Sequence, residues 1–123
     1  MLLFKLEQKG NMSIKQFAKM PLVDIMDDDR HFTIFVDDQV YFDDIYFPIR
    51  EFVKYALGWL KRKNDDFAYS TIDNEDNPLI AFYRLKSGWK LESVWQQFEC
   101  DKVFSDDDVK SFISEIISHV IAC

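Results

Sequence analysis

The stretch from His31 to Lys63 reads HFTIFVDDQVYFDDIYFPIREFVKYALGWLKRK, and its first part alternates in the manner of a half-buried strand. Phe32 and Ile34 fall on one face of this strand, with the intervening residues on the other. Residues 37–39 (DDQ) form a polar turn, and residues 40–42 (VYF) can return alongside the first strand. We therefore expect a β-hairpin at this position.

After the second acidic pair of the same stretch, the spacing of apolar residues becomes helical. Ile49, Val53, Ala56 and Leu60 recur on one face, and further apolar residues widen that face. Pro48 suits a first helical turn, because the N–H that proline lacks has no partner there. The pattern predicts an apolar helix that lies across a sheet as the main element of the core.

Other segments carry strand or helix signals. Residues 2–6 alternate as a first strand, and residues 67–72, 79–85 and 89–98 are typical of three further strands. The polar links between these last three are too short for a parallel crossover, so we expect an antiparallel meander. Ser105 caps a C-terminal helix whose apolar residues keep the i, i+3, i+4 spacing.

The composition is that of a folded domain with a substantial core. Of 123 residues, 48% are hydrophobic and 16% aromatic, whereas only 3 glycines and 3 prolines leave little room for long loops. We therefore predict a single domain over residues 1–123 of the α+β class. It would hold a mostly antiparallel sheet of about five to six strands, with two main helices packed chiefly on one face.

The formal net charge of −7 disfavours nonspecific binding to nucleic acid or to an anionic membrane. Nucleic acid and anionic membranes repel an acidic surface, whereas a cationic protein attracts it. The aromatic strand residues Trp89 and Trp95 could stack on bases, but the basic groove that base stacking requires is missing from the sequence around them. We expect no direct contact with nucleic acid or membrane, and we interpret the tryptophans as core or core-edge residues.

Cysteine usage and the N-terminus indicate a cytoplasmic protein. Cys100 and Cys123 fit no metal or redox spacing, and we interpret both as free thiols, with a disulfide as the alternative. The opening run MLLFKLEQKG is too short and too soon charged for a signal peptide. No segment approaches the ~20 apolar residues of a membrane span.

The sequence carries no catalytic signature, and we expect neither an enzyme nor a bound metal or cofactor. Residues 27–29 with His31 offer hard ligands, but their spacing does not match a calcium-binding EF-hand loop. We interpret His31 and His119 as structural or surface residues. Cys100 is followed by Asp101, whose charge disfavours the thiolate that a nucleophile needs.

Carboxylates are concentrated between Asp24 and Asp44, where Arg30 is the one permanent cation. Taken singly, each aspartate fits a solvated turn or a helix cap. Together they lie beside aromatic residues, a combination that a binding site for a basic protein requires, with carboxylates for steering and aromatic anchors for affinity. The interleaved aromatic residues are Tyr41, Phe42, Tyr46 and Phe47. The predicted partner-binding residues are Asp27, Asp28, Asp29, Asp37, Asp38, Tyr41, Asp43, Asp44 and Tyr46.

Residues 31–98, which include FTIFVDDQVYF, FPIREFVKYALGWL, FAYSTIDNEDNPLIAFYRL and GWKLESVWQQF, resemble a known type of bacterial protein. The chain is similar to the small acidic immunity proteins of contact-dependent growth inhibition and other polymorphic toxin systems. The likeness lies in short length, one acidic α+β domain, many aromatic residues and no catalytic motif. It implies a protein that binds and neutralises a cognate toxin domain, often a basic nuclease. The resemblance assigns a role to no individual residue, so the predicted site depends on the charge argument alone.

A second interpretation stays open at this point. The same acidic surface would suit a regulatory or adaptor domain that binds another basic protein, or a mimic of DNA that inhibits a nucleic-acid enzyme.

Overall fold

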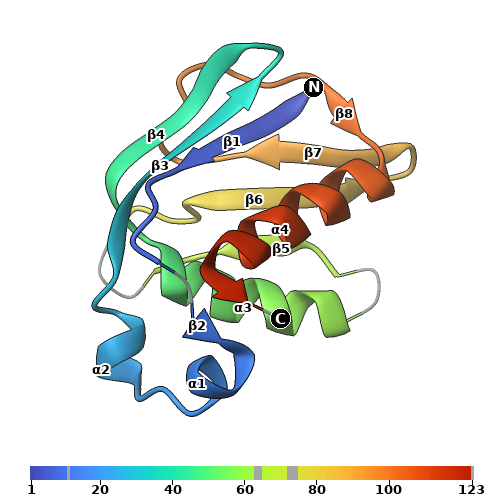
Figure 1. Cartoon of the computed structure of the whole chain (residues 1–123). Coiled ribbons are helices and arrows are strands. Elements are labelled where there is room, and N and C mark those ends of the chain that lie inside the picture. Colours follow the sequence, from blue (N-terminus) through green and yellow to red (C-terminus); the bar gives the residue numbers. More distant parts are fainter. Residues whose placement is uncertain (11, 63–64, 72–74, 123) are drawn as a thin grey trace.

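The computed structural model describes residues 1–10, 12–62, 65–71 and 75–122 and places their strands in two antiparallel sheets (Figure 1). One sheet has three strands in the order β1–β3–β4, and the other has four in the order β5–β6–β7–β8, while β2 and β9 form a short parallel pair. The elements in chain order are β1 Leu2–Leu6, β2 Met12–Ser13, α1 Ile14–Ala18, α2 Leu22–Ile25, β3 Asp29–Val36, β4 Gln39–Pro48, α3 Ile49–Lys61, β5 Phe67–Tyr69, β6 Ile80–Leu85, β7 Gly88–Glu92, β8 Val103–Phe104, α4 Asp106–Val120 and β9 Ile121–Ala122.

The expected hairpin is formed by β3 and β4. Its two turn residues, Asp37 and Asp38, have φ values of 50° and 69°, the left-handed conformation that a tight two-residue hairpin turn requires. Aspartate tolerates this conformation better than most side chains do. The prediction that the return strand ends by residue 42 is wrong, because β4 continues to Pro48 and α3 begins at the next residue.

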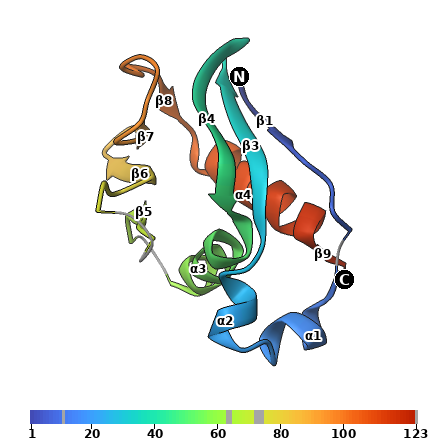
Figure 2. The same ribbon diagram turned by 90° about the vertical axis from the view of Figure 1, so that its left-hand side faces the viewer.

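Helices α3 and α4 cover one face of each sheet, and α3 packs against both sheets at once. In Figure 1 α4 crosses in front of β5 and β6, with α3 below it, and in Figure 2 α4 passes behind β3 and β4. The ring of Phe52 on α3 has its centroid 5.5 Å from Phe47 on β4. It lies 5.5 Å from Phe67 and 5.2 Å from Tyr69, both on β5. The core therefore runs without a break from one sheet to the other.

Helix α4 joins the same two sheets further along the core. Phe112 lies 5.8 Å from Phe4 on β1 and 6.1 Å from Phe82 on β6. The helix begins as the sequence predicts, because the Ser105 side chain accepts a hydrogen bond from the Asp108 N–H at 3.1 Å.

The predicted α+β class and the antiparallel strands are confirmed, but the strands form two sheets in place of the expected single sheet. One reason lies at the edge of β4. The N–H of Gln97, in the loop after β7, donates to the Tyr41 carbonyl at 2.7 Å, so a loop occupies a position where a further strand would pair. The strand expected over residues 89–98 correspondingly ends at Glu92.

Two smaller predictions lie partly outside the described residues. The strand expected over residues 67–72 ends at Tyr69, and residue 72 is not described. Cys100 is buried and free, whereas Cys123 is not described.

A buried ion cluster fixes the corner where α2, β3 and α3 meet. Asp28 is 5% exposed and accepts two hydrogen bonds from Arg30, at 3.0 Å from Nε and 2.8 Å from Nη2. The Arg50 Nε lies 3.0 Å from the same carboxylate, and the Asp28 carbonyl accepts the Ile49 N–H at the start of α3. One aspartate is thus the common counterion of two guanidinium groups, and it ties the hairpin to the helix that follows it.

Replacing Asp28 tests this role. We expect Asp28→Ala to lower the free energy of unfolding by about 3–5 kcal/mol, because it leaves Arg30 and Arg50 without their common counterion. Chemical denaturation of the variant measures the loss. The exposed neighbour Asp27 provides the control, and Asp27→Ala should stay within about 0.5 kcal/mol of the parent. Equal effects of the two substitutions would refute the assignment.

Candidate functional site

Strand β4 has a β-bulge close to its C-terminal end. One residue of β3, His31, lies opposite two residues of β4, Ile45 and Tyr46. A bulge redirects side chains, and here Ile45 and Tyr46 are both turned to the surface, 55% and 70% exposed. The Asp44 Oδ1 accepts a hydrogen bond from the Tyr46 N–H at 3.0 Å and holds this local conformation.

Two surface hollows flank Tyr46. The first, of about 310 Å³, lies at the seam between β4 and the second sheet, and Asp44, Leu79 and Trp95 are among its lining residues. The second, of about 460 Å³, lies between the bulge and the segment after β1. Tyr46 and Asp29 line both. We define the Tyr46 surface as Glu7, Asp27, Asp29, Asp44, Ile45, Tyr46 and Trp95.

The Tyr46 surface is acidic. Among the described residues that line the two hollows there are four carboxylates and a single cation, Lys9. The Lys9 Nζ donates to the Asp29 carbonyl at 2.7 Å and lies 3.8 Å from the Glu7 carboxylate. Negative charge therefore dominates around the most exposed aromatic side chain of the hairpin.

The structure brings together four of the residues that the sequence predicts for partner binding. Asp27, Asp29, Asp44 and Tyr46 all line these hollows, although they come from the α2–β3 connection and from both strands of the hairpin. They form the part of the predicted site that lies on one continuous surface.

Asp43 belongs to a separate cluster, because adjacent residues of a strand point to opposite faces. Its Oδ1 accepts a hydrogen bond from Thr33 Oγ1 at 2.7 Å and lies 2.7 Å from His31 Nε2. The Thr33 bond, followed by the His31 contact, lowers the pKa of Asp43. His31 is therefore a surface residue with a local partner.

Asp37 and Asp38 lie at the other end of the hairpin, about 20 Å from the bulge by the rise of the strand. Asp37 pairs with Lys102, whose Nζ is 2.8 Å from Oδ1, and with the amino group of Met1. The Lys102 bond, with help from that amino group, lowers the pKa of Asp37 from 3.8 to about 2. This pair does not join the Tyr46 surface.

Two predicted residues are buried, so their assignment to a partner-binding surface is wrong. Asp28 is the counterion of the cluster described above. Tyr41 is 0% exposed, because it is the extra residue of a second bulge and its ring packs against Phe98 with centroids 5.5 Å apart. Its hydroxyl donates to Gln96 Oε1 at 2.8 Å, and burial raises the pKa of Tyr41. The interleaved Phe42 and Phe47 are likewise core residues.

Sequence reasoning missed part of the surface for identifiable reasons. The signal for Ile45 depends on knowing burial: Phe42 and Phe47 are both buried but five positions apart, and an odd spacing on one face of a strand requires an extra residue. Glu7 and Trp95 left no comparable signal. They reach the site only through the packing of β1 and of the loop after β7.

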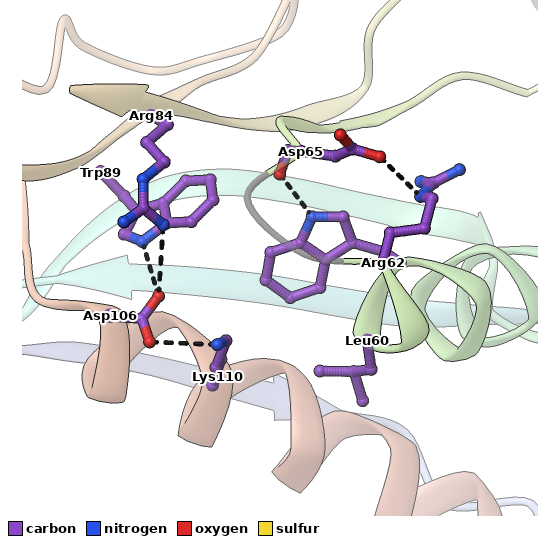
Figure 3. Close-up of a pocket in the computed structure, with 8 residues that line it drawn as sticks. Leu60, Arg62, Asp65, Arg84, Trp89, Asp106 and Lys110 are labelled. Atoms are coloured by element: carbon purple, nitrogen blue, oxygen red, sulfur yellow. Dashed lines mark hydrogen bonds and ion pairs between the residues drawn. The ribbon is translucent and has the colours of Figure 1, made fainter.

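A third hollow, between α3, β7 and α4, is too small and too well paired to be a ligand site (Figure 3). Its volume is about 20 Å³, roughly that of one water molecule. The Trp89 Nε1 donates to Asp106 at 3.2 Å, and the Trp59 Nε1 donates to the Asp65 carbonyl at 2.9 Å. Both tryptophans are core residues, as the sequence predicts.

A family model with the description "Domain of unknown function (DUF7878)" matches residues 2–121. The chain belongs to this family. No curated protein and no solved structure matches it. The DUF7878 match includes every residue of the Tyr46 surface, so the site lies within the family domain.

Metal and membrane features are missing from the part of the chain that the structure describes. It has no group of three or more His, Cys, Asp or Glu side chains placed to hold a metal ion. Its helices are all too short or too polar to cross a bilayer.

The hydrogen bond at the bulge gives a first test of the site. We expect Asp44→Ala to destabilise the chain by about 0.5–1.5 kcal/mol and to speed hydrogen exchange at the Tyr46 amide, because the amide loses its acceptor. The matched variant Asp44→Asn removes the charge but keeps an oxygen acceptor, so it should protect the amide as the parent does. Unchanged exchange in Asp44→Ala would contradict the role given to this bond.

The ion pair at the hairpin tip gives a second test, by NMR titration of the Asp37 carboxyl group. Because the folded pKa is lowered, the pairing stabilises the fold above pH 3.8, and this contribution is lost as the pH falls through about 2. We expect Lys102→Met to raise the pKa of Asp37 toward 3.8. Lys86→Met is the control and should leave it in place. A pKa that stays near 2 in Lys102→Met would refute the assigned cause.

Proposed function

We propose that this chain is an immunity protein that binds a basic toxin domain through the Tyr46 surface and neutralises it. The observation that carries the proposal is the meeting of four carboxylates with an exposed tyrosine between two hollows. Hollows accept protruding side chains of a partner, and a central aromatic residue contributes more binding energy than most contacts do.

The charge of the surface selects the class of partner. Carboxylates on an exposed surface raise the rate of encounter with a cationic protein and disfavour acidic partners. A toxin that cuts nucleic acid must hold phosphates with cationic groups, so an acidic inhibitor complements its substrate-binding region. The sequence resemblance to immunity proteins of polymorphic toxin systems supports the same partner.

Gene order separates this proposal from the adaptor or DNA-mimic alternative. An immunity protein is expected directly downstream of a gene for a large secreted protein with a variable C-terminal toxin domain. A basic partner of another kind, bound by the same surface, would favour the alternative.

The decisive test combines this chain with the toxin domain encoded next to it. We expect Glu7→Lys together with Asp27→Lys to slow association about tenfold at low salt, because the substitutions reverse two charges that steer the encounter. Tyr46→Ala should chiefly speed dissociation, because it removes the aromatic anchor. Stopped-flow kinetics measures both rates, and growth of cells that produce the toxin measures protection.

A matched control tests whether the change in net charge alone slows association. Glu92→Lys together with Glu115→Lys changes the charge of the chain by the same amount at exposed positions outside the Tyr46 surface. These substitutions should slow association much less. Full protection and unchanged kinetics with the Glu7, Asp27 and Tyr46 variants would overturn the proposed site.

A further inference from the structure

The hollow between Tyr46 and Trp95 combines three kinds of lining group. Asp29 and Asp44 provide carboxylates, Tyr46 and Trp95 provide aromatic rings, and the almost fully buried Leu79 lies in the floor. The hollow lies where β4 meets the strand ends of the second sheet. None of the described residues that line it is a lysine or an arginine. The small hollow of Figure 3, by contrast, is lined by three cationic side chains.

Elsewhere in the same chain, an arginine side chain contacts an aromatic ring and a carboxylate together. Arg84 lies over the ring of Trp89, with its guanidinium carbon 5.2 Å from the ring centroid, and its Nη1 is 3.8 Å from Asp106 (Figure 3). An arginine is thus bound by one aromatic face and one carboxylate together.

The arrangement occurs a second time on α3. Arg62 lies 5.6 Å from the ring centroid of Tyr55, and its Nε is 3.3 Å from Asp65. Two of the arginines in this fold therefore use a ring and a carboxylate at once.

We propose that the Tyr46–Trp95 hollow binds an arginine side chain of the partner protein. The planar guanidinium group stacks on an aromatic ring and forks to a carboxylate, whereas an ammonium group forms no comparable planar contact. Asp44 already accepts one bond from the Tyr46 N–H, and a carboxylate has further acceptor positions. The inference rests on the proposed function, because it names the anchor residue of the basic partner.

The test uses short peptides and the complete chain, so it does not require the toxin. The tripeptide Gly-Arg-Gly is titrated into the labelled protein while NMR follows the Trp95 indole N–H and the Tyr46 amide. We expect saturable shifts at both groups, with a dissociation constant in the millimolar range. Gly-citrulline-Gly, which keeps the shape but not the charge, should not bind, and Gly-Lys-Gly should bind more weakly than the arginine peptide.

Two substitutions of the exposed Tyr46 test whether its aromatic ring contributes to peptide binding. Tyr46→Phe keeps the aromatic face and should keep the affinity for Gly-Arg-Gly, whereas Tyr46→Ala should weaken it about two- to fivefold, the loss expected for one exposed cation–π contact. Val40→Ala, at an exposed position near the hairpin tip, should bind the peptide as the parent does.

Failure of this inference is distinguishable from failure of the proposed function. Gly-Arg-Gly that causes no saturable shift, or that binds no better than the lysine or citrulline peptide, overturns the arginine site. Toxin binding that still depends on Glu7 and Asp27 would then leave the proposed function standing. Conversely, specific binding of Gly-Arg-Gly without any protection from the neighbouring toxin would support the arginine site alone.

Discussion

The packing of aromatic rings around Phe52 is the interaction on which the rest of the structure depends. Because two sheets do not pair with each other through backbone hydrogen bonds, side chains must join them, and Phe52 contacts both. Phe47 extends this contact, with its centroid 5.8 Å from Tyr69 of the second sheet. The residue before Phe47 is Tyr46. The core contact that closes the seam between the sheets thus also fixes where the exposed tyrosine stands.

A second constraint is polar and acts at the start of β3. Asp28 holds Arg30 and Arg50 in a buried cluster, so the start of β3 and the start of α3 cannot move independently. The end of β4 lies between these two points. The aromatic contacts in the core and the ion cluster at the corner hold the end of β4 on both sides, and the bulge between them turns Ile45 and Tyr46 to solvent.

Much of the fold follows from periodicity, because burial on one face imposes a period of two on strands and 3.6 on helices. The first strand, the hairpin, the apolar helix and the capped C-terminal helix are all recognisable in this way. The two bulges in β4 are not, because each adds a residue and reverses the expected face. That is why Tyr41 looks like a surface residue in the sequence but is buried, and why β4 looks shorter than it is. Residues such as Trp95, which join the site through tertiary packing, leave no local pattern.

The count of carboxylates in this chain says less about function than their placement does. Asp28 pairs with the buried Arg30 and the partly buried Arg50, Asp37 pairs with Lys102, and Asp43 bonds to Thr33, so part of the acidic bias serves the fold. Reversing the charge of the buried Asp28 would place three cations together, so the fold fixes that charge. The carboxylates around Tyr46 differ in that they surround a bulge that the core holds from behind through Phe42 and Phe47. A surface supported in this way tolerates changes in its exposed side chains, as recognition of a particular partner requires.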